Sequence, residues 1–156
     1  MVTMVGKKQN PPTAGLVVIG NEILTGKTED TNSHYLCREL NFLGVEMKRI
    51  TSVPDEPEPI GEVVREFSES YTWVFTSGGI GPTHDDITVE SIARGFGVET
   101  EVNPSLEKAI REHYGEKLTR DHLKMALVPV GAELEDIPGK FFWQVRFRNI
   151  FIKRFQ

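Results

Sequence analysis

The stretch that decides the fold is WVFTSGGIGPTHDD, residues 73–86. Its first four residues, 73–76, have the apolar and β-branched character of a buried strand. Three glycines follow within four positions, Gly78, Gly79 and Gly81. Glycines between a strand and a helix let the backbone turn sharply and bring its N–H groups close to a ligand. The stretch therefore predicts a loop that binds an anion, and a tight turn with a purely structural role is the alternative.

A helix is expected directly after this loop, with Thr88 as its N-cap and Gly97 as its stop. The N-terminus of that helix would point the positive end of its dipole at the loop. Ser77 and Thr83 supply hydroxyl groups that can donate to phosphate oxygens, and Pro82 stiffens the turn. These residues strengthen the prediction that the bound anion is a phosphate.

The rest of the chain alternates between expected strands and expected helices. Further strands are expected at residues 16–19 and 45–53, with one or two more between 141 and 152. The other helices are expected to begin near residues 30–33, 57, 103–104 and 119, the first with Leu36, Leu40 and Leu43 on its buried face and the last ending before Pro129. Because crossovers between parallel strands are right-handed, this order predicts an α/β three-layer sandwich with a mostly parallel central sheet.

Length, charge and cysteine content narrow the class of protein. A chain of 156 residues suits one domain, and its formal net charge of −5 argues against a nucleic-acid or anionic-membrane partner. The single cysteine, Cys37, excludes an intramolecular disulfide and a CxxC-type zinc site. No apolar run is long enough to span a bilayer. We expect a cytoplasmic protein with a flexible leader at residues 1–12 and a single domain at 13–156.

Carboxylates surround the predicted phosphate loop. Asp85 and Asp86 end the loop, and they would repel a phosphate unless a cation lay between them and it. Mg²⁺ is bound in this way, by one or two carboxylates together with substrate phosphates. Glu22 and Asp55 follow other predicted strands, so they should lie at the same edge of the sheet. The alternative is that these acids are solvated residues of turns and helix starts, favoured there by the helix dipole.

Four motifs resemble, in order, those of the molybdopterin-binding domain superfamily: GNEIL at 20–24, DTN at 30–32, VPD at 53–55 and SGGIGPTHDDIT at 77–88. Over about residues 14–135 the chain looks closest to the domain shared by the competence-damage-inducible protein A family and the amino-terminal half of eukaryotic-type FAD synthases. Molybdopterin adenylyltransferases usually have an Arg-Asp-Val-Thr-like stretch where residues 85–88 read DDIT.

The resemblance implies metal-dependent cleavage of ADP-ribose- or FAD-like dinucleotides at their pyrophosphate. Mg²⁺, Mn²⁺ or Co²⁺ would be the metal, held by Asp85 and Asp86. Asp86 would also be catalytic, together with Asp55 or Glu22 as the group that orients the attacking water. The nucleotide or pterin ligand, which includes molybdopterin itself, would contact Ser77, Gly78, Gly79, Gly81, Pro82, Thr83, Asp30, Asn32 and Thr88.

The carboxyl-terminal sequence departs from the family pattern. Family members usually continue from the last strand into a Leu-Pro-Gly-x-Pro segment, whereas residues 153–156 read KRFQ. This departure favours an alternative, a domain truncated at its carboxyl end that binds molybdopterin or a nucleotide without turnover, or that is only structural. Domains of this superfamily commonly assemble, and Phe141, Phe142, Trp143 and Phe151 add aromatic surface, so we expect a homo-oligomer.

Overall fold

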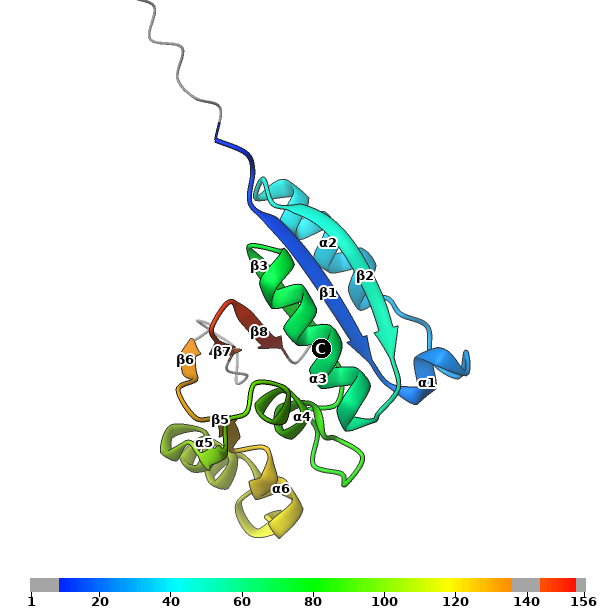
Figure 1. Ribbon diagram of the computed structural model, residues 1–156. Helices are drawn as coiled ribbons and strands as arrows, with labels where there is room; N and C mark the ends of the chain where they lie inside the picture. Colours follow the sequence, from blue (N-terminus) through cyan, green and yellow to red (C-terminus); the bar gives the residue numbers. More distant parts are fainter. Residues whose placement is uncertain (1–8, 136–143, 154–156) are drawn as a thin grey trace, which may run out of the picture.

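The computed structural model describes residues 9–135 and 144–153 (Figure 1). A six-stranded sheet lies at its centre in the order β2-β1-β3-β8-β7-β6. The parallel strands are β1 (Thr13–Ile19), β2 (Glu46–Val53), β3 (Trp73–Ser77) and β8 (Ile150–Lys153). The antiparallel strands are β7 (Gln144–Phe147) and β6 (Glu133–Glu135). The predicted α/β fold with a mostly parallel central sheet is confirmed.

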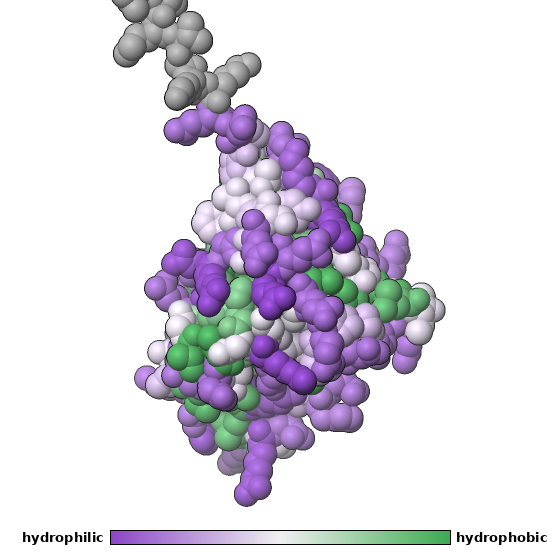
Figure 2. Space-filling model, viewed as in Figure 1, coloured by the Kyte–Doolittle hydropathy of each residue, from purple (hydrophilic) through white to green (hydrophobic). Residues whose placement is uncertain are grey.

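Helices cover both faces of the sheet. The helices are α1 (Asn21–Leu24), α2 (Asn32–Phe42), α3 (Pro57–Ser70), α4 (Thr88–Gly95), α5 (Pro104–Tyr114) and α6 (Arg120–Lys124), with a 3-10 turn at Gly115–Lys117. Leu16 and Val18 of β1 face α2 in one apolar cluster, and Val17 and Ile19 face α3 and α4 in the other. This alternation follows from the two-residue period of a strand. Burial of the apolar side chains in two clusters leaves a face that is mostly hydrophilic (Figure 2).

Helices α3 and α4 cross closely because each has a glycine at the contact. A Cβ atom on Gly95 would lie 2.8 Å from the Cα of Gly61, and one on Gly61 would lie 2.9 Å from the carbonyl oxygen of Ser91. Real Cβ atoms are almost never found so near another atom. The close crossing fixes α4, and therefore the loop that enters it, against the sheet.

Asn149, at the turn between β7 and β8, ties that hairpin to the end of α3. Its Nδ2 donates to the carbonyl oxygens of Ser68 and Tyr71, at 2.9 and 3.0 Å, and its Oδ1 accepts from Ser68 Oγ at 2.5 Å. Carbonyl groups at the end of a helix have no partner within the helix. The Asn149 amide therefore caps α3 and holds β8 beside β3.

The structure corrects two expectations about the helices. Leu43 is 71% exposed, because α2 ends at Phe42 and Gly44 turns the chain away with a φ of 78°. The segment expected to be helical up to Pro129 is helical only in α6, because β5 (Leu127–Pro129) pairs with β4 (Thr100–Val102) in a small antiparallel sheet. Strands β4, β5 and β6 were not predicted.

Several sequence expectations fall outside the described residues. They concern most of the leader, at residues 1–8, and the aromatic residues 141–143, which formed part of the argument for a homo-oligomer. Among the helices of the described ranges, none has the length and apolar character needed to cross a membrane.

Candidate functional site

The glycine loop lies where β3 ends, pressed against the end of β1 and the start of α4. Gly78 and Gly79 have positive φ angles of 98° and 69°. A Cβ atom on Gly78 would lie 2.1 Å from the carbonyl oxygen of Ile19, and one on Gly79 would lie 2.1 Å from Oγ1 of Thr88. Glycine is therefore required at both positions for steric as well as conformational reasons.

Thr88 joins the loop to α4 and does not act as the N-cap, so the predicted cap is wrong. The cap position is Ile87, whose side chain makes no capping bond. Thr88 is fully buried as the first residue of the helix, its Oγ1 donates to the carbonyl oxygen of Gly78 at 2.9 Å, and its N–H donates to that of Gly79 at 3.1 Å. A ligand contact of Thr88 remains a prediction, which this buried position does not favour.

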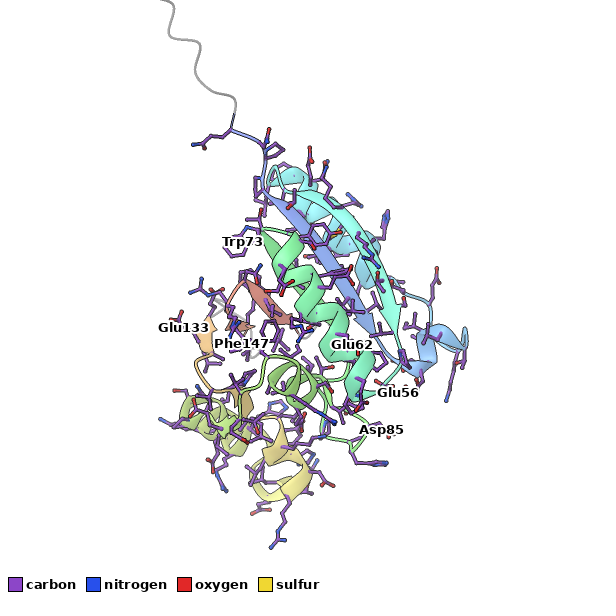
Figure 3. The ribbon with its side chains drawn as sticks, viewed as in Figure 1. Glu56, Glu62, Trp73, Asp85, Glu133 and Phe147 are labelled. Carbon is purple, nitrogen blue, oxygen red and sulfur yellow. The ribbon has the colours of Figure 1, made fainter. Side chains whose placement is uncertain are left out.

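The carboxylate of Asp86, at the end of the loop, accepts two hydrogen bonds from Thr83. Its Oδ2 accepts from the N–H of Thr83 at 2.9 Å and from Oγ1 of Thr83 at 2.7 Å. The Thr83 hydroxyl, expected to donate to a phosphate, thus donates within the loop. Asp85, labelled in Figure 3, is 74% exposed, and its Oδ1 lies 3.3 Å from Nε2 of His84. Both bonds to Asp86 use Oδ2, which leaves Oδ1 as the oxygen that could face a cation.

The turns after β1 and β2 are joined by a reciprocal pair of hydrogen bonds. The N–H of Asn21 donates to Oδ2 of Asp55 at 3.0 Å, and the N–H of Asp55 donates to Oδ1 of Asn21 at 3.1 Å. The carboxylate of Glu22 lies over Gly20, where a Cβ atom would collide with it. Because β1, β2 and β3 are parallel, Glu22 and Asp55 lie at the same sheet edge as the glycine loop, as predicted.

Asp30 and Asn32, both predicted to bind ligand, make hydrogen bonds within the protein at the start of α2. Asp30 accepts from the N–H of Ser33 at 3.1 Å and from its hydroxyl, which caps the first turn of α2. Asn32 Nδ2 donates to Oγ of Ser77 at 3.1 Å, and Ser77 is the buried last residue of β3. Asn32 thus fastens α2 to the strand from which the loop emerges, and Asp30 stabilises the start of α2.

A cavity of about 180 Å³ lies beside the loop, between α4, α5 and α6. Its walls are mainly apolar and include Val89, Leu106, Ile110, Leu127, Val145 and Ile152. Asp86, Glu90 and Lys124 supply charge, and the loop contributes Gly79 and Gly81. Of the four carboxylates predicted around one cleft, only Asp86 lines this cavity. An apolar pocket with a few polar groups is the usual form of a small-molecule site.

Lys124 contacts the loop from α6, and sequence reasoning missed it. Its Nζ donates to the carbonyl oxygens of Thr83 and Asp86, at 3.0 and 2.5 Å, and lies 3.7 Å from Oε1 of Glu90. A single lysine in a short polar helix resembles a solvated surface charge. No local pattern could have indicated a contact with a residue 38 positions earlier.

Comparison with known proteins identifies the family. The family model described as "Probable molybdopterin binding domain" matches residues 15–145. The chain belongs to this family. The molybdopterin-binding domain is 43% identical over 125 residues to a protein of Metallosphaera sedula and 46% identical over 107 residues to a probable FAD synthase of Caenorhabditis briggsae. These matches cover 78% and 66% of the chain, but only 47% and 20% of the two relatives.

Solved structures agree with this assignment. The molybdopterin-binding domain is similar to the protein CinA of Thermoplasma acidophilum, described as of unknown function, with a TM-score of 0.83, 30% identity and coverage of 94% of this chain and 89% of that one. MoaB of Thermus thermophilus shares the fold, with a TM-score of 0.54, 22% identity and coverage of 92% and 80%. The resemblance to CinA and FAD synthase relatives is confirmed.

The acids of the molybdopterin-binding domain fit a cation only in part. Within residues 9–135 and 144–153, no three His, Cys, Asp or Glu residues gather closely enough to hold a metal ion. Asp86 and Asp85 could supply one or two carboxylates, which suffices for Mg²⁺ when phosphate oxygens of a ligand complete its coordination. The site thus suits an ion that arrives with a phosphate ligand better than a permanently bound one.

Proposed function

We propose that the domain hydrolyses ADP-ribose- or FAD-like dinucleotides at their pyrophosphate, with Mg²⁺, Mn²⁺ or Co²⁺ as the required cation. The observation that carries the proposal is the position of Asp86, which ends the glycine loop and also lines the apolar cavity. A dinucleotide whose diphosphate binds the loop would place one of its ring systems against the apolar walls of the cavity. The adjacent carboxylates then favour a cation beside the phosphates, because like charges would otherwise repel.

Different residues of the chain would hold the cation, bind the phosphate oxygens and accept a proton from water. Asp86 and Asp85 would hold the cation against the diphosphate, and the cation would neutralise phosphate charge when bound. The N–H groups of the loop would bind the oxygens on which charge develops. Asp55 or Glu22 would accept a proton from water, whose oxygen bonds to one phosphorus atom while the bridging P–O bond breaks, so that AMP and the phosphate monoester of the other half are released.

The second candidate function, an alternative to hydrolysis, is the binding of molybdopterin or a nucleotide without turnover. Asp86 Oδ2 is occupied by both hydrogen bonds from Thr83, and three metal ligands do not gather in the described part of the chain. A phosphate-bearing pterin could bind the same loop and cavity without a cation. The family description, a molybdopterin-binding domain, favours such a ligand.

Incubation with ADP-ribose or FAD, with and without each metal, distinguishes the two functions. Hydrolysis predicts AMP, detected by chromatography, only in the presence of a metal. We expect Asp86→Asn to lower this activity at least tenfold with little change in the thermal midpoint, because an amide oxygen can still accept from Thr83. Asp121→Asn, on the exposed side of α6, is the matched control. Ligand binding that needs no metal and yields no AMP would favour the binding function instead.

A further inference from the structure

We propose that Lys124 is the positioning residue of the glycine loop, and that it fixes the direction in which two loop N–H groups point. The loop is the one to which the proposed function assigns the diphosphate, so the ligand in this inference rests on that function. The positioning role itself rests on contacts of Lys124 with the protein.

Three oxygen atoms of the protein lie around the Lys124 ammonium group, and two of them accept hydrogen bonds from it. Such a group has three N–H donors and no acceptor. The carbonyl oxygens of Thr83 and Asp86 accept at 3.0 and 2.5 Å, and the carboxylate of Glu90 lies 3.7 Å away. The side chain is only 25% exposed. Lys124 lines the cavity, but its two hydrogen bonds go to the loop, and this favours a role in positioning the loop.

These two carbonyl bonds constrain the orientation of two peptide groups, and the N–H of Asp86 also donates to the Thr83 carbonyl oxygen, at 3.1 Å. A trans peptide is planar, with its C=O and the following N–H pointing in opposite directions. The described residues contain no cis peptide. Since the carbonyls of Thr83 and Asp86 point toward Lys124, the N–H groups of His84 and Ile87 point away from it. Both N–H groups are thereby directed to the side of the loop opposite Lys124, where backbone N–H groups can bind an anion.

Helix α6 holds Lys124 at the distance that these bonds require. The helix has only five residues, too few to be stable alone, so it depends on local support. Thr119 and His122 form a reciprocal capping box, in which the Thr119 N–H donates to His122 Nδ1 at 3.0 Å and the His122 N–H donates to Thr119 Oγ1 at 3.3 Å. The ring of Tyr114 stacks on His122 with centroids 3.7 Å apart. The capping box stabilises the first turn of α6, and the stacked ring connects α6 to α5, so together they hold Lys124 in position.

The first test measures hydrogen exchange of the ligand-free protein. The variants are Lys124→Met, which keeps the apolar stem, Lys124→Arg, which restores donors and charge, and Lys117→Met as an exposed lysine control. In Lys124→Met we expect at least tenfold faster exchange at the amides of Thr83 and Asp86, which bond within the loop, and recovery in Lys124→Arg. Unchanged exchange, or faster exchange spread equally over the core strands, would overturn the proposal.

The second test measures affinity for Mg²⁺ with inorganic pyrophosphate by calorimetry, together with KM and kcat for ADP-ribose. We expect Lys124→Met to bind pyrophosphate at least tenfold more weakly and to raise KM more than it lowers kcat, with partial recovery in Lys124→Arg. A wild type that binds pyrophosphate but releases no AMP would refute the proposed function and leave Lys124 as the positioning residue. Affinity and KM within twofold of wild type in Lys124→Met would overturn the role of Lys124 and leave the proposed function intact.

Discussion

Gly79→Ala should destabilise the domain through one defined contact, that with Thr88. The new methyl group would lie 2.1 Å from Thr88 Oγ1 and 3.3 Å from Thr88 Cβ. Thr88 is fully buried and donates to the carbonyl oxygen of Gly78, so its side chain cannot turn away without losing that bond. The substitution therefore combines backbone strain, overpacking and a displaced buried hydrogen bond.

The size of the effect follows from these three costs. A non-glycine residue in the left-handed region costs about 1–2 kcal/mol. Overpacking of a close-packed site costs about 1–3 kcal/mol, and an unsatisfied buried polar group costs about the same. The lower entropy of the unfolded alanine chain offsets about 0.4–1 kcal/mol. We expect a net loss of about 4 kcal/mol, which a domain with a stability of about 5–15 kcal/mol can survive.

Urea unfolding followed by tryptophan fluorescence measures this loss, with Gly97→Ala as the matched control. Gly97 has a φ of 67°, close to the 69° of Gly79, but a Cβ atom there would meet nothing within 4 Å. Its replacement should therefore cost only about 1 kcal/mol, from backbone strain. In a Thr88→Ala background, the cost of Gly79→Ala should fall by at least 1 kcal/mol because the collision is relieved. Equal losses in Gly79→Ala and Gly97→Ala would refute the contact argument.

Three other predictions concern the crossing of α3 and α4, the hairpin turn and the sheet edge. Gly61→Ala should lower the free energy of unfolding in urea by about 1–3 kcal/mol, because its methyl group would meet the carbonyl oxygen of Ser91. The control Glu62→Ala, on the exposed side of α3, should change it by less than about 0.5 kcal/mol. Asn149→Ala should lower stability by about 1–3 kcal/mol, since it leaves carbonyl groups of α3 without their donor; an unchanged midpoint would contradict this capping role. Asp55→Asn should keep the bond from Asn21 and the thermal midpoint but lower AMP release at least tenfold if Asp55 orients water; equal rates would leave that role to Glu22.

The core strands and the helices that cover them could be predicted because their patterns are local. The run at residues 16–19 is apolar without interruption, as a strand covered on both faces requires. Asn103 and Pro104 predict the start of α5, where the Asn103 side chain accepts from the N–H groups of Ser105 and Leu106. Such caps depend on residues two or three positions apart, so the sequence contains all the information that they need.

The short strands could not be predicted because distant partners hold them. Strand β6 has three residues, Glu133–Glu135, with charged residues at both ends. It forms because β7 pairs with it, and Arg146 donates to Glu133 at 2.7 Å across the ladder. That hydrogen bond to Glu133 also raises the pKa of Arg146. A partner 13 residues away leaves no local sign in a three-residue segment.

In the candidate site, too, the residues with local contacts could be predicted from the sequence more readily than those with distant contacts. The need for glycine at positions 78 and 79 was predictable, since a loop between a buried strand and a helix must turn sharply within a few residues. The engagement of Asp86 with Thr83 spans three residues, yet sequence reasoning assigned both side chains to a ligand. Lys124 is the most distant case, because its partners Asp86 and Thr83 lie 38 and 41 positions earlier in the chain. In a site built from a local loop and a distant support, the loop can thus be predicted from the sequence while the distant residue that contacts it is missed.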